Sequence, residues 1–192
     1  MAVGVLSLQG AVREHLETLR RCGVEAITVR TPEEVVAVEG LILPGGESTT
    51  IGKLMVRYGL QQPMQELVAS GRPLLGTCAG MILMAKTIQD GIVDQPRLAV
   101  MDIAVQRNAF GRQVDSFETD LEFKGIEGGP ARAVFIRAPV ITGVGDGVEV
   151  LATHEGTPVA ARQRNLLVLS FHPELTGDTR VHEYFLAMRT GK

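Results

Sequence analysis

Cysteine, aromatic residues and long apolar runs are scarce in this sequence. It has 192 residues, of which two are cysteine, none is tryptophan and 4% are aromatic. Cys22 and Cys78 are too few for a disulfide framework or a four-thiolate metal site. No apolar stretch approaches the roughly 20 residues that span a bilayer, and no basic segment precedes the apolar residues 3–8, as one would in a signal peptide. We therefore expect a reduced, cytoplasmic protein without a membrane partner.

Neither sign of charge is in large excess. Lys and Arg number 19 and Asp and Glu number 22, which gives a net charge of −3. This balance argues against a basic surface for nucleic acid or for an anionic membrane. Apolar residues make up 45% and charged residues 21%, which is ordinary for a globular protein and excludes disorder. The 22 glycines exceed the usual share and indicate tight turns and close backbone approaches.

The first half of the chain alternates between the hydrophobic spacing of strands and that of helices. Val12, Leu16 and Leu19, for example, share one helical face, and Gly23 is placed to end that helix. Because parallel neighbours need crossover connections, this alternation predicts a parallel sheet with helices on both faces. The expected strands are 3–8, 25–29, 40–43 and 74–76, and the expected helices are 11–22, 32–38, 51–58, 63–70 and 79–87.

The second half is richer in strand-like segments joined by short polar or glycine-rich turns. We expect these segments to add mixed or antiparallel strands to the sheet, followed by a last helix near residues 181–188. No repeat or linker interrupts the chain, so residues 1–192 are predicted to form one α/β domain with a mixed, mostly parallel sheet between helices. The segments are 100–105, 133–136, 148–154, 158–163 and 166–171.

Residues 76–80 read Gly-Thr-Cys-Ala-Gly and lie between an expected strand and an expected helix. This pattern has the form of a nucleophile elbow with sulfur in place of oxygen. Such a sharp turn crowds the backbone, which accounts for glycine on both sides, and the helix N-terminus favours a thiolate. The pattern therefore predicts that Cys78 is a nucleophile, whereas Cys22, at a helix end, is expected to be structural.

His172 and Glu174 follow the last expected strand, and Pro173 stiffens the link between them. A nucleophilic cysteine needs a base near its sulfur and a carboxylate that holds the imidazole in one tautomer. We therefore predict a Cys78–His172–Glu174 triad.

The other three histidines are weaker candidates for the base. His15 and His182 lie beside glutamates in expected amphipathic helices, and we expect both to be solvated. His154 ends an expected strand and is the one competing base.

A glycine-rich turn at residues 44–46 follows the third expected strand. Attack on a carbonyl creates an oxyanion that needs at least two donors. The bare backbone at Gly45 and Gly46 lets a substrate approach, and the amide of Ala79 is the expected second donor. Ser48 or Thr49 is expected to cap the next helix. A phosphate loop is excluded, because five residues separate Gly46 from the next glycine and Leu54 replaces the required Ser or Thr.

With these residues in place, the chain resembles the triad-type (class I) glutamine amidotransferase family, and within it the glutaminase subunits of pyridoxal 5′-phosphate synthases. The resemblance spans essentially the full length, and the elbow and the His-Pro-Glu unit identify only the class. The matching segments are LQGAVREH (8–15), LPGGESTT (43–50), GTCAGM (76–81), RNAFGRQ (107–113), FIRAP (135–139) and FHPELT (171–176).

The resemblance implies a flavodoxin-like class I glutaminase fold and a site for L-glutamine. Cys78 would attack the glutamine side-chain amide, with His172 and Glu174 as its partners and with the oxyanion between the amides of Gly46 and Ala79. No cofactor or metal is implied. The positions that match the family's glutamine-binding residues are Gly45, Gly46, Glu47, Arg107, Ile136 and Arg137.

The resemblance also implies a partner, namely a synthase subunit that receives the ammonia and builds pyridoxal 5′-phosphate in a large hetero-oligomer. We expect the chain alone to be weakly active, because the flexible Gly45–Gly46 peptide can point an oxygen into the oxyanion site. Three alternatives stay open. They are the glutaminase of another amidotransferase, such as imidazole glycerol phosphate synthase; an elbow-cysteine hydrolase or stress protein without glutamine specificity; and a non-catalytic interaction module.

Overall fold

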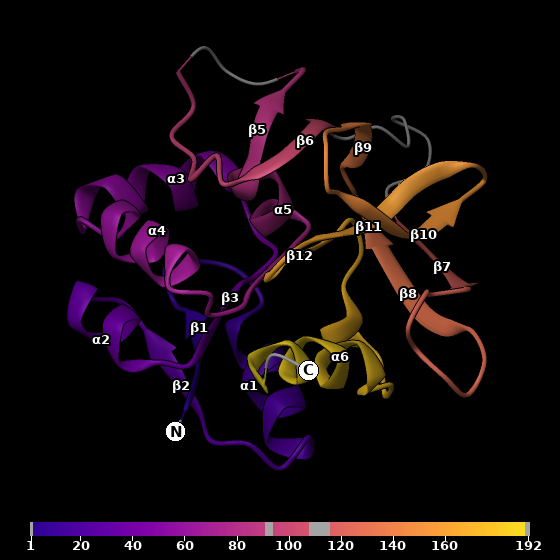
Figure 1. Cartoon of the computed structure of the whole chain (residues 1–192), viewed down its shortest axis with the longest axis horizontal. Coiled ribbons are helices and arrows are strands. Elements are labelled where there is room, and N and C mark those ends of the chain that lie inside the picture. The colour runs from indigo at the N-terminus through magenta and orange to yellow at the C-terminus, as the bar shows by residue number, and fades with distance from the viewer. Residues whose placement is uncertain (1, 91–93, 108–115, 191–192) are drawn as a thin grey trace.

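The computed structural model describes residues 2–90, 94–107 and 116–190 (Figure 1). Its largest sheet contains the strands β1 (Val3–Leu6), β2 (Ala26–Val29), β3 (Gly40–Leu43), β4 (Leu74–Thr77), β10 (Glu149–His154), β11 (Thr157–Gln163) and β12 (Leu166–Leu169). Their order across the sheet is β10-β11-β12-β4-β3-β1-β2. Five of these strands are parallel, β11 is antiparallel to β12, and β10 is antiparallel to β11. The predicted mixed, mostly parallel sheet is therefore confirmed.

Helices cover both faces of this sheet, as predicted. Ile42 of β3 belongs to the same buried cluster as Leu19 and Phe185, whereas its neighbour Leu43 packs in the opposite cluster with Met55. This alternation follows from the two-residue period of a strand. Every helix in the described part of the chain is too short or too polar to cross a bilayer. The helices are α1 (Val12–Arg21), α2 (Pro32–Ala37), α3 (Ser48–Arg57), α4 (Gln61–Ala69), α5 (Ala79–Met84) and α6 (Arg180–Ala187).

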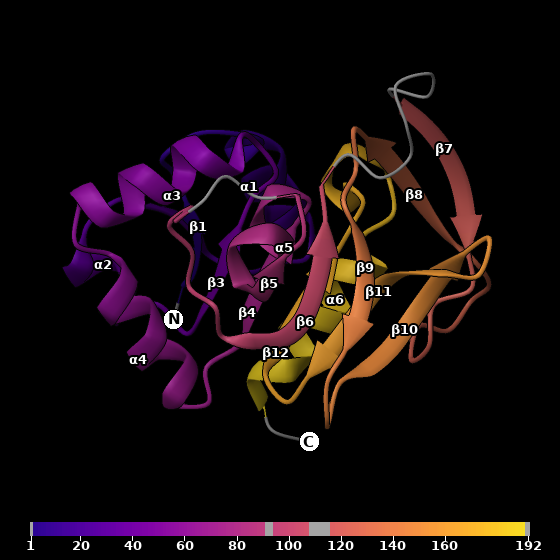
Figure 2. The same ribbon diagram turned by 90° about the horizontal axis from the view of Figure 1, so that it is seen from above.

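Two smaller sheets depart from the sequence-based expectation. One contains β5 (Ala85–Ile88), β6 (Met101–Gln106) and β9 (Val140–Val144), and the other pairs β7 (Ser116–Leu121) with β8 (Ala131–Ile136). The expectation that all late strands join the main sheet was therefore wrong for β6 and β8. The expected helix 79–87 also ends early, at Met84, because the next four residues pair in parallel with β6. Figures 1 and 2 show β7, β8 and β10 on the opposite side of the molecule from α2, α3 and α4.

The parallel strands place their carboxyl ends at one edge of the sheet, where sites form in open α/β folds. Leu43 of β3 is in register with Gly76 of β4, and Thr77 of β4 is in register with Leu169 of β12. The segments that follow these strands carry the glycine turn, Cys78 and His172. The topology therefore brings three distant parts of the sequence to the same edge.

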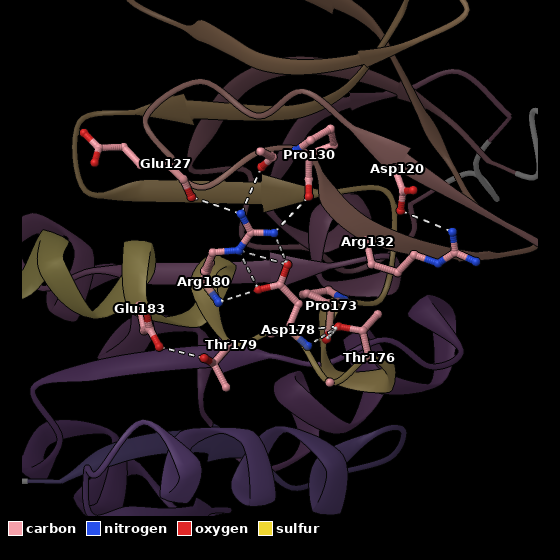
Figure 3. Close-up of polar contacts among 12 residues, drawn as sticks. Asp120, Glu127, Pro130, Arg132, Pro173, Thr176, Asp178, Thr179, Arg180 and Glu183 are labelled. Atoms are coloured by element: carbon pink, nitrogen blue, oxygen red, sulfur yellow. Dashed lines mark hydrogen bonds and ion pairs between the residues drawn. The ribbon is translucent and has the colours of Figure 1, made fainter.

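Arg180, at the start of α6, ties this helix to the loop between β7 and β8 (Figure 3). Its guanidinium donates hydrogen bonds to the carbonyl oxygens of Glu127, Gly129 and Pro130, at 2.9 to 3.0 Å. It also donates to the carboxylate of Asp178, at 2.6 and 3.0 Å, and this contact lowers the pKa of that carboxyl. One side chain thus joins two segments that are about 50 residues apart in the sequence.

We expect Arg180→Ala to lower the melting temperature by a few degrees, because several backbone carbonyls lose their donor at once. Arg132 provides the matched control, since its ion pairs with Glu118 and Asp120 lie on the exposed surface. Arg132→Ala should change the melting temperature little, because exposed ion pairs stabilise a fold only weakly. Thermal denaturation followed by circular dichroism measures both changes, and equal losses would contradict the assigned role of Arg180.

Candidate active site

Cys78 lies at a sharp turn from β4 into α5. Its backbone has φ of 49° and ψ of −102°, a conformation that L-residues rarely adopt. Its amide donates to the carbonyl of Leu169 at 2.8 Å, which fixes the turn to β12. Glycine is required on both sides, because a Cβ on Gly76 would lie 2.6 Å from the carbonyl carbon of Gly80 and a Cβ on Gly80 would overlap the carbonyl oxygen of Leu43.

We expect Gly80→Ala to lower the free energy of unfolding by about 1–3 kcal/mol, because the overlapped atom belongs to the backbone and cannot rotate away. Gly177→Ala is the matched control, since a Cβ there meets nothing within 4 Å. Its effect should stay within about 0.5 kcal/mol, as for other surface substitutions. Urea denaturation measures both values, and unchanged stability of Gly80→Ala would contradict the packing described for the turn.

His172 and Glu174 are held together just beyond β12. His172 Nδ1 lies 2.7 Å from Glu174 Oε1, and both residues are buried. The backbone amide of His172 donates to the carbonyl of Val134 in β8, at 2.8 Å. Pro173 begins a short 3₁₀ turn, η1 (Pro173–Leu175), that turns the carboxylate back toward the imidazole. The hydrogen bond to β8 and the 3₁₀ turn thus both hold the pair in place.

The electrostatics of this pair favour an imidazolium beside a carboxylate. Burial by itself lowers the pKa of His172, but hydrogen bonds with Cys78 and Glu174 and the charge of Glu174 outweigh it and raise that pKa to about 10. Burial also disfavours the ionised form of Glu174, yet the nearby His15 and His172 hold its pKa below the usual range. These contacts favour a protonated His172 beside an ionised Glu174.

A cavity of about 430 Å³ opens above the cysteine, a size typical of small-molecule sites. Glu174 lies behind His172, whereas the other predicted site residues line this cavity together. They are Gly45, Gly46, Glu47, Cys78, Ala79, Arg107, Ile136, Arg137 and His172. Sequence analysis did not assign six further lining residues to the site, which are Gln9, Gly10, Ala11, Ser48, Ile82 and Leu175.

The glycine turn after β3 packs tightly against its surroundings. A Cβ on Gly45 would overlap Cε1 of His172, and a Cβ on Gly46 would overlap the side-chain oxygen of Gln9. The carbonyl of Gly45 accepts from the amide of Ala11 at 3.0 Å. Gln9 Oε1 accepts from the amide of Glu47 at 2.7 Å. Gln9 thus supports this turn, and its position just after β1 is the signal that could have identified it.

Glu47 caps α3, which corrects the expected cap at Ser48 or Thr49. Its carboxylate accepts from the amides of Thr49 and Thr50, at 2.9 and 2.7 Å, and satisfies two donors of the first turn. Although partial burial opposes ionisation, these hydrogen bonds lower the pKa of Glu47 to about 2. Arg107 Nη2 lies 3.8 Å from the same carboxylate. The first helical turn is thus held by a fully ionised group.

Residues 136 and 137 border the cysteine from β8. Cys78 Sγ lies 4.0 Å from the carbonyl oxygen of Ile136, to which it donates a weak hydrogen bond. Arg137 follows in the left-handed region, with φ of 43°. Arg107 donates to Gln95 Oε1 at 3.2 Å, and residues 108–113 of its motif lie outside the described residues. In residues 2–90, 94–107 and 116–190, no group of three or more His, Cys, Asp or Glu could hold a metal ion.

The expectation that His15 and His182 are solvated was wrong, since both are 0% exposed. His15 lies on the same helical face as Val12, Leu16 and Leu19, so the hydrophobic spacing of α1 could have revealed its burial. Its Nε2 atom is 3.5 Å from Glu174 Oε2, directly behind the triad.

His154, the competing base, lies instead among aromatic rings. The ring of Phe117 is 5.0 Å from it and that of Phe135 is 5.7 Å from it. Cys22 is half-buried and unpaired at the end of α1.

Known proteins resemble this chain along nearly its whole length. Residues 5–190 match the model of the SNO glutamine amidotransferase family. The chain is 58% identical over 190 residues to pyridoxal 5′-phosphate synthase subunit PdxT of Herpetosiphon aurantiacus, covering 98% of this chain and all of that one. It is 55% identical over 186 residues to the subunit of the same name from Carboxydothermus hydrogenoformans, covering 97% and 96% of the two chains. A crystal structure of a glutamine amidotransferase superimposes with a TM-score of 0.93 at 53% identity, over 98% of each chain. The chain therefore belongs to the SNO glutamine amidotransferase family.

Proposed function

We propose that this chain hydrolyses L-glutamine to L-glutamate and ammonia, and that it supplies the ammonia to the synthase subunit of a pyridoxal 5′-phosphate synthase. The observation that carries the proposal is the alignment of Cys78, His172 and Glu174 beneath one cavity. The relatives whose names include pyridoxal 5′-phosphate synthase subunit match the chain along nearly its whole length. Both the chemistry and the choice of partner are therefore supported.

The proposed reaction runs through a thioester. The proton of the Cys78 thiol passes to the imidazole of His172 as the sulfur attacks the side-chain carbonyl carbon of glutamine, and the oxyanion is stabilised by the amides of Gly46 and Ala79. His172 gives a proton to the departing nitrogen, so that ammonia leaves and a γ-glutamyl thioester remains. His172 then takes a proton from water, which attacks the thioester and releases glutamate and the thiol.

Glutamine would be held by the other residues around the cavity. Among the described residues that line the cavity, Arg107 and Arg137 are the cations for its α-carboxylate, since arginine binds carboxylates through paired hydrogen bonds. The ionised Glu47 is suited to the α-ammonium group. Backbone groups of Gly45 and Ile136 border the cavity between these charges and the sulfur.

The partner subunit would receive ammonia directly, because ammonia in bulk water becomes protonated and loses its nucleophilicity. We propose a large hetero-oligomer in which many glutaminases surround a synthase core. In this structure the carbonyl oxygen of Gly45 accepts a hydrogen bond from the amide of Ala11. We propose that the Gly45–Gly46 peptide of the free chain also adopts the orientation that points this carbonyl oxygen into the oxyanion site, and that docking of the synthase removes that orientation, so the chain alone should be weakly active.

The test measures glutamate and pyridoxal 5′-phosphate with glutamine as the sole nitrogen source. The chain is assayed alone, with the synthase subunit of a pyridoxal 5′-phosphate synthase, and with that of an imidazole glycerol phosphate synthase. We expect rapid glutamate formation, coupled to pyridoxal 5′-phosphate, only with the first partner. Product formation with the second partner would favour the alternative amidotransferase, and the absence of glutamate in every mixture would overturn the proposed hydrolysis. Full turnover by the chain alone would refute its dependence on docking.

A further inference from the structure

Two fully buried histidines extend the triad into the protein interior. His15, from α1, and His182, from α6, are each 0% exposed. His15 Nδ1 lies 2.9 Å from His182 Nε2, and His15 Nε2 lies 3.5 Å from Glu174 Oε2 and 3.2 Å from Thr77 Oγ1. In space, the polar groups thus form one continuous line, which runs in the order Cys78, His172, Glu174, His15 and His182. The proposed mechanism uses only the first three.

The distances decide which nitrogen of each imidazole carries hydrogen. If His15 carried its hydrogen on Nδ1, a bare nitrogen lone pair would face the carboxylate of Glu174, which is repulsive. Hydrogen on Nε2 instead bonds to Thr77 Oγ1, at 3.2 Å, and lies beside Glu174 Oε2, which is 3.5 Å from Nε2. His15 Nδ1 then accepts from the Nε2 hydrogen of His182. In this arrangement His182 Nδ1, which has no hydrogen-bond partner among the described residues, carries no orphaned hydrogen.

The burial of both rings keeps them neutral. Burial lowers the pKa of His15, and it lowers that of His182 to about 3. Other charges act on the pair less strongly. Glu174 and Glu14 favour protonation of His15, whereas His172 opposes it, and Arg21 opposes protonation of His182. Neutral imidazoles can donate in one direction along a chain, which two charged rings could not do.

We propose that His15 is a positioning residue whose Nε2–H, bonded to Thr77 Oγ1, lies 3.5 Å from Glu174 Oε2 and stabilises the ionised carboxylate in its observed orientation, and that His182 holds His15 in the tautomer that makes this possible. Glu174 Oε1 is bound by His172, whereas Oε2 is buried without a hydrogen-bond partner among the described residues and has His15 Nε2 at 3.5 Å. The contact would keep the carboxylate ionised in a dry environment and fix its rotation. The inference rests on the proposed glutaminase function, because it assigns a role within that triad.

The test compares His15→Gln with His15→Leu in the complex with the synthase subunit. The amide nitrogen of glutamine can replace imidazole Nε2 as a donor, whereas leucine is apolar and of similar size. We expect His15→Leu to lower kcat about tenfold, because a freed carboxylate no longer aligns His172. We also expect the acidic limb of the pH profile of kcat/KM to move up by about one pH unit, since Glu174 loses the neighbouring N–H that stabilises its ionised form. His15→Gln should restore the pH profile and most of kcat.

A merely structural role for His15 would give a different result. In that case both variants would lose stability and activity in parallel, without movement of the acidic limb, and this outcome would overturn the proposal. His154→Gln is the control, because it changes a histidine outside this line of groups and should leave the pH profile unchanged. Thermal denaturation of each variant shows whether folding is intact.

Nitrogen-15 NMR of the native chain provides a second test that needs no activity. The imidazole nitrogen shifts of His15 and His182, assigned from the signals that disappear in His15→Gln and in His182→Gln, should report neutral rings with hydrogen on Nε2 from about pH 5 to pH 8. Hydrogen on Nδ1 of His15 would overturn the inference even if the enzyme is active. An inactive native complex would instead contradict the proposed function and leave the tautomer measurement to decide the inference.

Discussion

Replacing Cys78 by alanine is expected to reduce glutamate formation in the synthase complex by about 10⁴-fold or more. The substitution removes the atom that forms the thioester, and loss of a nucleophile removes most of the catalysis of a triad. The cavity is otherwise retained, because alanine is smaller than cysteine. Glutamine binding, measured by isothermal titration calorimetry, should therefore change by no more than a few-fold. Steady-state release of glutamate gives the catalytic loss.

Cys22→Ala is the matched control, since the chain has only two cysteines and Cys22 lies at the end of α1 away from the cavity. It should retain nearly full activity. Residual turnover of more than a few per cent in Cys78→Ala would show that another group performs the chemistry. Loss of activity in both variants would mean that the effect of Cys78→Ala is not specific to the cysteine at the elbow.

Gly45→Ala is expected to lower kcat by about 100-fold or more. The added methyl group would overlap Cε1 of His172, so the imidazole has to move away from both Cys78 and Glu174. Small displacements of a catalytic group are costly, and a shift of 1 Å can reduce the rate about 10²-fold. Gly45 does not have a positive φ, so the effect is steric rather than a matter of backbone strain. Steady-state kinetics of the complex measure the loss.

The same measurement on Gly177→Ala separates this effect from a general loss of stability. A Cβ on Gly177 meets nothing within 4 Å, so this variant should behave like the native chain. If Gly45→Ala were fully active, His172 would have enough freedom to avoid the methyl group, and the rigid placement described for the triad would be wrong. A crystal structure of Gly45→Ala would show the displaced ring.

The helices and parallel strands of the first half could be predicted because each is encoded by a local pattern. The spacing of Val12, Leu16 and Leu19 indicates α1, and alternating elements require a parallel sheet. The strands β5, β7 and β9 could not be predicted in this way. Residues 85–88, for example, continue the apolar pattern of α5 and become a strand only because β6 lies beside them. Pairing with a distant segment overrides local preference.

Part of the candidate site could also be predicted from local sequence patterns. The glycines on both sides of Cys78 indicate a nucleophile elbow. The adjacent residues His172, Pro173 and Glu174 indicate a base and its carboxylate. The cap by Glu47 was missed because the residue types preferred as caps come directly after it. The burial of His15 and His182 was missed because neighbouring glutamates suggested a solvated face.

The sequence by itself determined that this chain forms an α/β fold with a cysteine at a strand-to-helix elbow, since these features depend on neighbouring residues. Only the tertiary structure decided that His15 and His182 stand behind Glu174 and that the pKa of His172 rises to about 10. The physical reason is that the burial of a side chain, and the charges that act on it, depend on every segment that packs around it. Here those segments come from α1, β4, the turn after β12 and α6, which meet only after the chain has folded.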